Sequence, residues 1–441
     1  MDKIIEFTTS SYTVARIQRY FGVQTEIDLD HEGESHSPGK NGDLLSHDCK
    51  PAGENANDRD IANKMLTDDN VSNGQFRYNL RSRSKQGDPS RGNGAPAAAT
   101  TQHSGDAEFE KQASSISGNV EYTVNSKFWF YLFHFGGIAA NELFLSNFIP
   151  WCWWNLSEWV TRRVLIVFVV VTYLGQGAKD VFQMPRPSSP PVAKLESLYG
   201  KEHGMPSTHA MMIVCIPATF FHFTIERYQF PVSVALVITC SIYFITCGSR
   251  LYLGMHNLLD IIVGTVSAAV MTVILLPYLG MIDDFLSEHQ YGIIASLVIG
   301  ITMAVCHPTL DTWTDSRDLS TLVAGVGTGT FVGRWLKLHY GFPPVDPTGP
   351  LPMEIPPPDL VWWFCMLSRT VIGVVVLLAT KLIMKPVMYN LIAFILGMPI
   401  DEARSTTLVV VQMPRVFFTS LLLAVNAVFL CPILHDMCGL L

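Results

Sequence analysis

Long apolar runs recur along the chain from about residue 127 to the C-terminus. Each run has roughly 18–25 residues, which is enough for a helix to cross a hydrocarbon core about 30 Å thick. The apolar positions are continuous and do not alternate with polar ones, so the pattern favours helices over the strands of a barrel. We therefore predict an all-α, polytopic transmembrane helix bundle of about eight to ten spans. The candidate spans cover residues 128–150, 161–178, 209–225, 229–248, 258–280, 291–308, 319–338, 358–381 and 414–438, and the short apolar stretch 385–400 is predicted to be interfacial or re-entrant.

Residues 1–120 differ from the rest of the chain in composition, and we interpret them as an N-terminal tail. From Glu26 to Gln112 the tail is rich in Gly, Asn, Ser, Asp and Pro. It has too few apolar residues to bury a core, so we expect it to be disordered. The segment 13–23, which contains VARIQRYFGV, is different, because it predicts a short amphipathic helix for the membrane surface or for docking.

The overall composition also indicates a membrane protein. Of the 441 residues, 49% are hydrophobic and only 15% are charged, whereas soluble domains carry roughly 25% charged residues. Much of the net charge of −8 comes from the N-terminal tail, and no basic stripe with interleaved aromatic residues suggests a nucleic-acid partner. The nine cysteines show neither a disulfide framework nor zinc-ligand spacing, and we predict that most are buried thiols.

Three short polar clusters interrupt the apolar chain. Ionisable residues next to lipid are costly, so such clusters are candidates for a functional site. The first follows the second predicted span, the second opens the third span and the third opens the fifth, so all three can meet at one membrane face. The alternative is that the cations mark cytosolic loops and the histidines cap helix ends. The clusters are KDVFQMPRP with Lys179 and Arg186, MPSTHA with Ser207, Thr208 and His209, and SRLYLGMHNLLD with Ser249, Arg250, His256 and Asp260.

The cations and the start of the third predicted span suit a phosphate group. The guanidinium groups of Arg186 and Arg250 match phosphate oxygens bidentately, and Lys179 adds a point charge. Ser207 stands just before an apolar helix that begins near His209, and serine is a favoured N-cap residue. The free N–H groups and the dipole of that helix end attract anions. We therefore predict a phosphate-binding site.

The two histidines suit phosphoryl transfer. His256 and Asp260 are four residues apart, so on a helix they would share a face and the carboxylate could hold one ring N–H. His256 could then attack phosphorus and form a phosphohistidine, while His209 donates a proton to the leaving oxygen. Asp180 and Asp260 are the only acids in the clusters, and three cations would repel a divalent ion. We therefore predict a reaction that needs no metal and no cofactor.

The order of these residues resembles a known signature. Three segments carry the signature: Lys, six residues and Arg-Pro at 179–187, Pro-Ser-x-His at 206–209, and Ser-Arg, five residues and His at 249–256. Together they are similar to the three-part motif of the type 2 phosphatidic acid phosphatase superfamily. One position departs from it, because Thr208 stands where glycine is more usual. Within the superfamily the chain resembles the sphingosine-1-phosphate phosphatases, and their longer-tailed type in particular. This likeness runs from about residue 120 to the end and includes VARIQRYFGV.

The resemblance implies a multi-pass phosphohydrolase of the endoplasmic reticulum membrane with its site facing the lumen. Its lipid substrates in the bilayer would be sphingosine 1-phosphate and dihydrosphingosine 1-phosphate, and its products the long-chain base and phosphate. His256 would be the nucleophile, Asp260 would orient it, and His209 would be the proton donor. The phosphate would be bound by Lys179, Arg186, Ser207, Thr208, Ser249 and Arg250.

Two other activities are compatible with the same residues. One is a membrane lipid phosphotransferase on the same scaffold, which would pass the phosphoryl group to another lipid. The other is a transporter, in which the polar clusters would line a pathway. In each case we expect the tail at 1–120, a transmembrane core of the phosphatidic acid phosphatase kind at 121–280, and further transmembrane helices at 281–441.

Overall fold

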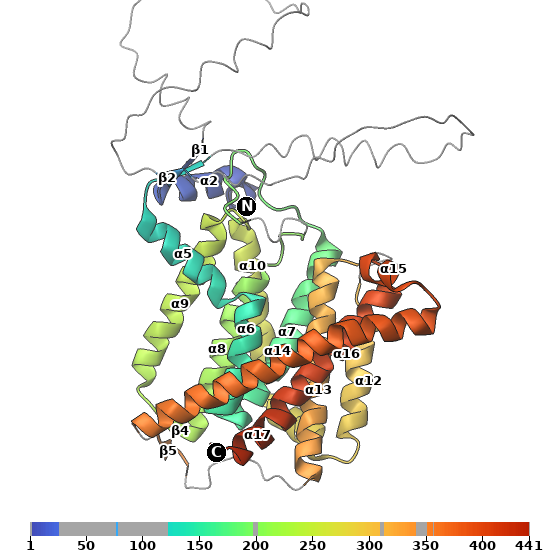
Figure 1. Cartoon of the computed structure of the whole chain (residues 1–441). Helices are drawn as coiled ribbons and strands as arrows, with labels where there is room; N and C mark the ends of the chain where they lie inside the picture. Colours follow the sequence, from blue (N-terminus) through green and yellow to red (C-terminus); the bar gives the residue numbers. More distant parts are fainter. Residues whose placement is uncertain are drawn as a thin grey trace, which may run out of the picture.

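The computed structural model describes residues 2–25, 76–77, 122–196, 202–308, 313–340, 351–355 and 357–440. Apart from residues 76–77, the stretch for which we expected disorder lies outside the described residues. The described chain is almost entirely helical, and its main helices run side by side as a bundle (Figure 1). The prediction of an all-α transmembrane bundle is therefore confirmed.

The helices range from single turns to a rod that exceeds the thickness of a bilayer. They are α1 (Asp2–Thr9), α2 (Ser11–Tyr20), α5 (Lys127–Ala139), α6 (Glu142–Asn155), α7 (Glu158–Phe182), α8 (Thr208–Arg227), α9 (Val232–Tyr252), α10 (Leu258–Leu275), η1 (Leu276–Tyr278), α11 (Leu279–Glu288), α12 (Gly292–Val305), α13 (Asp315–His339), α14 (Leu360–Leu396), α15 (Ile400–Ser405), α16 (Val409–Val425), η2 (Asn426–Leu430) and α17 (Cys431–Met437). Two small sheets join loops: β1 (Val23–Thr25) and β2 (Phe76–Arg77) both pair antiparallel with β3 (Tyr122–Val124), and β4 (Tyr228–Gln229) pairs parallel with β5 (Met353–Glu354).

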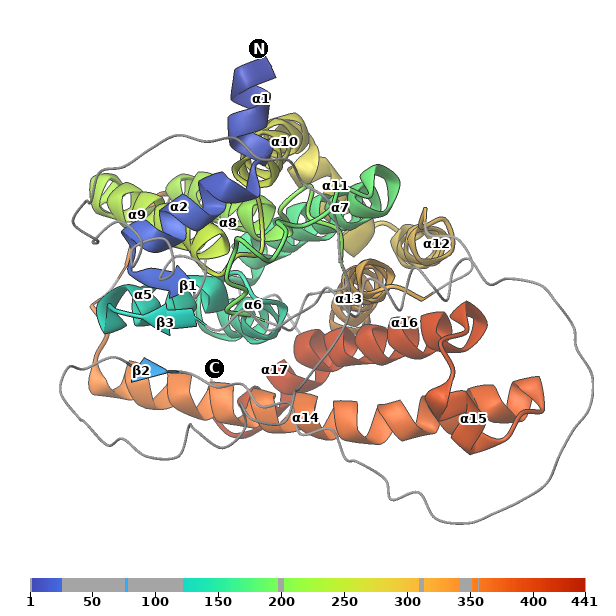
Figure 2. The same cartoon turned by 90° about the horizontal axis from the view of Figure 1, so that it is seen from above.

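Six helical segments among the described residues are long and apolar enough to cross a membrane. They are α7, α8, α9, the continuous segment Leu258–Glu288, α14 and the continuous segment Val409–Met437. The chain is therefore a multi-pass integral membrane protein. The helix α14 crosses the bundle obliquely in Figure 1 and lies along one side of it in Figure 2.

The count of six is lower than the eight to ten spans that hydropathy suggested. The apolar run 128–150 is broken at Ala140 and Asn141 into α5 and α6, and neither half is long enough to span. The helix α12 has only 14 residues, and α13, which carries charged side chains towards both of its ends, is not among the six. The stretch 385–400 is not a separate interfacial segment, because α14 continues through Pro386 as far as Leu396.

Helix α7 lies between α8 and α13 and provides much of the central core (Figure 2). Its apolar run from Val164 to Val171 belongs to one buried cluster with Met211 and Cys215 of α8 and Val323 of α13. Burial of this kind contributes about 25 cal/mol for each square ångström of apolar surface. The packing therefore fixes the C-terminal end of α7 beside the N-terminal end of α8, which are the two ends that carry the first two polar clusters.

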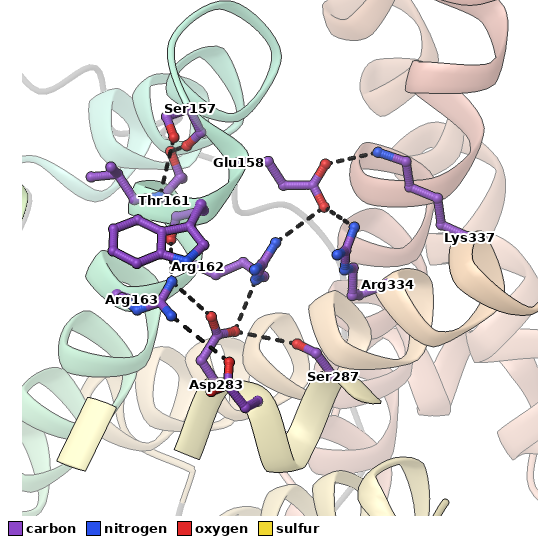
Figure 3. Close-up of polar contacts among 12 residues, drawn as sticks. Ser157, Glu158, Thr161, Arg162, Arg163, Asp283, Ser287, Arg334 and Lys337 are labelled. Atoms are coloured by element: carbon purple, nitrogen blue, oxygen red, sulfur yellow. Dashed lines mark hydrogen bonds and ion pairs between the residues drawn. The ribbon is translucent and has the colours of Figure 1, made fainter. Parts of the chain in front are cut away.

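A buried ionic network joins the N-terminal end of α7 to α13 (Figure 3). The Glu158 carboxylate lies 2.6 Å from the Arg334 guanidinium, 2.7 Å from Lys337 Nζ and 3.3 Å from Arg162. All four side chains are 5% exposed or less. Glu158 and Lys179 are about six helical turns apart, so the network lies roughly 30 Å from Lys179, at the opposite end of the bundle.

Asp283 of α11 extends this network to a third helix (Figure 3). Its carboxylate lies 2.8 Å from Arg162 Nε and 3.0 Å from Arg163 Nη1, and its side chain is fully buried. Buried charges are tolerated only when they are paired and hydrogen-bonded. The network therefore links α7, α11 and α13 at one end of the bundle.

Candidate active site

The three polar clusters meet at the end of the bundle where the N-terminal helices lie (Figure 1). The segment between α7 and α8 is tied to the turn between α9 and α10 by backbone and side-chain hydrogen bonds. Leu195 N–H donates to the Leu253 carbonyl at 3.2 Å, and Arg186 Nη1 donates to the Met255 carbonyl at 2.8 Å. Two segments about sixty residues apart in the chain thus form one surface, as the alternation of the spans predicted.

The clusters enclose a small polar pocket. It contains six of the nine predicted site residues, and it also contains two residues that the sequence did not single out. The lining residues are Lys179, Arg186, Glu202, Thr208, His209, Arg250, Met255 and His256. Ser207, Ser249 and Asp260 lie just behind this lining and are buried.

Each of the three cations in the pocket contacts a carboxylate from the segment between α7 and α8. Lys179 Nζ lies 2.5 Å from Glu202 Oε2, and Arg186 Nη2 lies 3.6 Å from the same oxygen. Arg250 Nη1 lies 3.5 Å from Glu196 Oε2. The guanidinium of Arg186 is also fixed by donation to the Glu202 and Met255 carbonyls. The cations are therefore held in place around one small volume.

His256 lies in the turn before α10 and not on the helix itself, which begins at Leu258. Its Nδ1 is 3.6 Å from Asp260 Oδ2, an ion-pair contact that is longer than a hydrogen bond. The carboxylate oxygen instead accepts a hydrogen bond of 2.8 Å from the Asn257 N–H, which caps the helix. Asp260 is thus near enough to orient the imidazole, but its hydrogen bond from Asn257 secures the turn.

Burial and the charges of Arg186, Lys179 and Arg250 hold the pKa of His256 well below its ordinary value of about 6.5. A backbone contact with Gly204 acts in the opposite direction. Burial disfavours the imidazolium, and so do nearby positive charges. The ring is therefore neutral at physiological pH, and a neutral ring is the form that can attack phosphorus.

The second cluster forms the N-terminal end of α8. Ser207 is the N-cap residue, as predicted, and Thr208 and His209 are the first residues of the helix. All three are buried, and Thr208 and His209 face the pocket. The Ser207 N–H donates to the Asp260 carbonyl at 3.0 Å, and α10 approaches so closely that a Cβ on Gly264 would lie 2.6 Å from the Ser207 carbonyl oxygen. The helix end is therefore aimed at the pocket by its packing against α10.

Ser249 supports the site from behind. Its hydroxyl donates to the Thr246 carbonyl at 2.7 Å and accepts from Arg250 Nε at 3.2 Å. In this arrangement the hydroxyl positions the guanidinium of Arg250 and does not point at the pocket. Asp180, the other acid of the first cluster, turns towards the start of α13, where Thr314 Oγ1 donates to it at 3.3 Å.

The N-terminal helices cover the same surface. The segment 13–23 forms a helix, α2, that ends at Tyr20, and Val14 and Ala15 are buried against Val192 and Leu251. The helix α2 therefore packs on the transmembrane core. Of the two roles predicted for this segment, the geometry corresponds to docking.

Gln18 of α2 joins the two segments that form the pocket. Its Nε2 donates to the Ala193 carbonyl at 2.7 Å and to the Tyr252 carbonyl at 2.9 Å, and its Oε1 accepts from the Ala193 N–H at 3.0 Å. Only 2% of the residue is exposed. This contact could not be predicted from the sequence, because Gln18 lies 175 residues from Ala193.

Replacing Gln18 with leucine should lower both the melting temperature and the specific activity. The substitution leaves three buried backbone groups unpaired, and each such group costs about 1–3 kcal/mol. The matched control is Gln24→Leu, because the Gln24 side chain accepts only an exposed hydrogen bond from Asn125. Thermal unfolding in detergent and initial rates measure the effect. Equal values for the two variants would contradict a positioning role for α2.

Residues 161–283 match the PAP2 superfamily, and this range contains every residue of the pocket. A sphingosine-1-phosphate phosphatase 1 of Rattus norvegicus is 34% identical over 313 residues, which cover 70% of this chain and 73% of that protein. The chain belongs to the sphingosine-1-phosphate phosphatase family.

Other relatives extend this family. A human sphingosine-1-phosphate phosphatase 2 is 31% identical over 322 residues, which cover 73% of this chain and 80% of that protein. A dihydrosphingosine 1-phosphate phosphatase of Saccharomyces cerevisiae is 26% identical over 216 residues, which cover 48% of this chain and 54% of that protein. No solved structure shows a significant match. As a member of the sphingosine-1-phosphate phosphatase family, the protein is an integral membrane phosphatase that acts on lipid substrates.

Proposed function

We propose that this protein hydrolyses sphingosine 1-phosphate and dihydrosphingosine 1-phosphate to the long-chain base and phosphate, with no metal ion and through a phosphohistidine. The observation that carries the proposal is the convergence of three cations and two histidines on one enclosed pocket at the end of a membrane bundle. A pocket at the end of the membrane bundle suits an amphiphile whose hydrocarbon tail stays in the bilayer. The names of the relatives support the choice of lipid.

The first half of the reaction transfers the phosphoryl group to the enzyme. Lys179, Arg186 and Arg250 neutralise the phosphate oxygens, and the N–H groups at the start of α8 donate to them. Neutral His256 attacks phosphorus as the bond to the lipid oxygen breaks. His209, which the bound phosphate dianion keeps protonated, gives its proton to that oxygen, so the lipid leaves as the alcohol.

The second half releases phosphate. His209, now neutral, takes a proton from a water molecule, which attacks the phosphorus of the phosphohistidine. The bond between phosphorus and His256 breaks, and both histidines return to their initial protonation states. Asp260 stabilises the positive charge that His256 carries in the intermediate. We also propose the endoplasmic reticulum as the location of the enzyme, on the basis of the family resemblance.

A substrate panel tests the proposal. Membranes that contain the wild type or His256→Ala receive long-chain base phosphates, phosphatidate, lysophosphatidate or glucose 6-phosphate, with and without EDTA and with and without an acceptor alcohol. The proposal expects phosphate release from long-chain base phosphates that EDTA does not change. Loss of activity on chelation would contradict the metal-free route, and transfer to the alcohol in preference to water would favour a phosphotransferase.

The rate should depend on pH in a bell shape, with no acidic limb from His256 near pH 6.5 and an alkaline limb from loss of the proton that His209 donates. The neutral form of His256 is needed for attack, and its lowered pKa keeps that form populated as the pH falls. The measurement is kcat/KM from pH 4 to 9, compared with the second pKa of the lipid phosphate from ³¹P NMR. An acidic limb that coincides with the second pKa of the substrate phosphate agrees with the lowered pKa of His256. A further acidic limb near pH 6.5 would contradict it.

A further inference from the structure

The pocket contains a carboxylate where a phosphatase would be expected to have only groups that attract phosphate. The Glu202 side chain is 5% exposed and lines the pocket together with both histidines. Its Oε2 contacts Lys179 at 2.5 Å and Arg186 at 3.6 Å, so it lies among the cations assigned to phosphate. A phosphate dianion cannot reach these cations until the carboxylate moves, because two anions at that distance repel each other.

The charges around the pocket fit a substrate that carries a cation of its own. Among the side chains that line the pocket, the Glu202 carboxylate offsets one of the three positive charges of Lys179, Arg186 and Arg250. A phosphate monoester carries a charge of about −2 near neutral pH. A phosphorylated sphingoid base also carries an ammonium group, which can pair with Glu202 when the phosphate takes Lys179 and Arg186. A glycerolipid phosphate has no ammonium group and would leave Glu202 beside the phosphate without a cation.

The position of the ammonium group suits Glu202 as its partner. In a sphingoid base phosphate the amine is on the carbon next to the one that bears the phosphate. A carboxylate that gives up Lys179 and Arg186 to the incoming phosphate therefore needs only a short movement to meet the amine. A carboxylate and an ammonium group form a strong, charge-assisted hydrogen bond. A buried ammonium group without such a partner would be costly.

We propose that Glu202 binds the ammonium group of the substrate and thereby selects sphingoid base phosphates over other lipid phosphates. This inference rests on the proposed function. Glu202 gains a partner when the substrate carries an amine. When the substrate has no amine, Glu202 is only repelled by the phosphate. Discrimination thus comes from both an attraction and a penalty.

The test compares dihydrosphingosine 1-phosphate with its N-acetylated form, which has the same chain and phosphate but no positive charge. Glu202→Gln should lower kcat/KM for the amine by about 10- to 100-fold, the range expected for a lost hydrogen bond to a charged group. The value for the N-acetylated form should stay the same or rise. Glu202→Asp keeps the charge and should restore part of the preference. Glu196→Gln is the matched control, because Glu196 does not line the pocket, and it should leave the ratio of the two values within about threefold.

Other outcomes have distinct meanings. If Glu202→Gln lowers kcat/KM for both substrates by the same factor, Glu202 only holds Lys179 in place and the proposal is wrong. If both values rise equally, the carboxylate only competes with phosphate and the proposal is also wrong. If the wild type hydrolyses neither lipid, the proposed function itself fails. A wild type that hydrolyses both lipids equally well would leave the function intact and overturn the role of Glu202.

Discussion

Replacing His256 with alanine is expected to lower phosphate release from sphingosine 1-phosphate by about 10³-fold or more, because His256 is the group proposed to form the covalent intermediate. The side chain is only 3% exposed and lies in the pocket with Lys179, Arg186 and Arg250. The remaining rate would come from the cationic side chains of the pocket alone. The measurement is phosphate release by the purified variant under single-turnover conditions.

A second histidine variant controls for non-specific effects. His222→Ala changes a half-exposed ring near the far end of α8, where its Nε2 lies 3.5 Å from the Glu226 carboxylate. It should keep the wild-type rate. Binding of vanadate or phosphate to His256→Ala should also persist, because the cations remain. A His256→Ala protein that is folded and still turns over at a wild-type rate would remove the nucleophile from the scheme.

Replacing Glu158 with glutamine should lower the free energy of unfolding by about 3–5 kcal/mol, the cost of breaking a buried ion pair. Glu158 faces three buried cations, Arg162, Arg334 and Lys337. Without its charge, Asp283 would be the one remaining fully buried carboxylate in the network of Figure 3. The measurement is the fraction of monodisperse protein in detergent after heating.

Asp284→Asn is the matched control for this change. It removes the same charge at the edge of the network, but the Asp284 side chain is 68% exposed and lies 3.9 Å from Arg163. Exposed pairs contribute about 0–1 kcal/mol. The protein that remains folded in either variant should keep its KM, because the network and the pocket lie at opposite ends of α7. Equal thermal stability of Glu158→Gln and the wild type would show that the network does not stabilise the bundle.

The sequence predicted the class of fold well because lipid imposes a simple rule on composition. Long apolar runs in lipid must form helices. Because successive spans run in alternating directions, the three polar clusters come to one end of the bundle. Hydropathy could not predict where a helix breaks. The run 128–150 is mostly apolar, yet it is divided at Ala140 and Asn141 into α5 and α6, and α14 continues beyond its predicted end at 381 through Pro386.

The pocket residues that belong to short sequence motifs could be predicted. Lys179, Arg250 and His256 lie together as their spacing suggested. The contact of Glu202 with Lys179 was not predictable, because it depends on the path of a loop. The same is true of Gln18, whose partners are far away in the chain. Long-range contacts of single polar side chains leave no periodic pattern in a sequence.

The most direct test of the account is to trap the covalent intermediate. Purified enzyme is mixed with ³²P-labelled sphingosine 1-phosphate and quenched in alkali, where phosphohistidine is stable, and the labelled peptide is identified by mass spectrometry. The account predicts one label, on His256, that is lost in acid and absent from His256→Ala. A label on another residue, or steady hydrolysis by the wild type with no label under any quench, would contradict it.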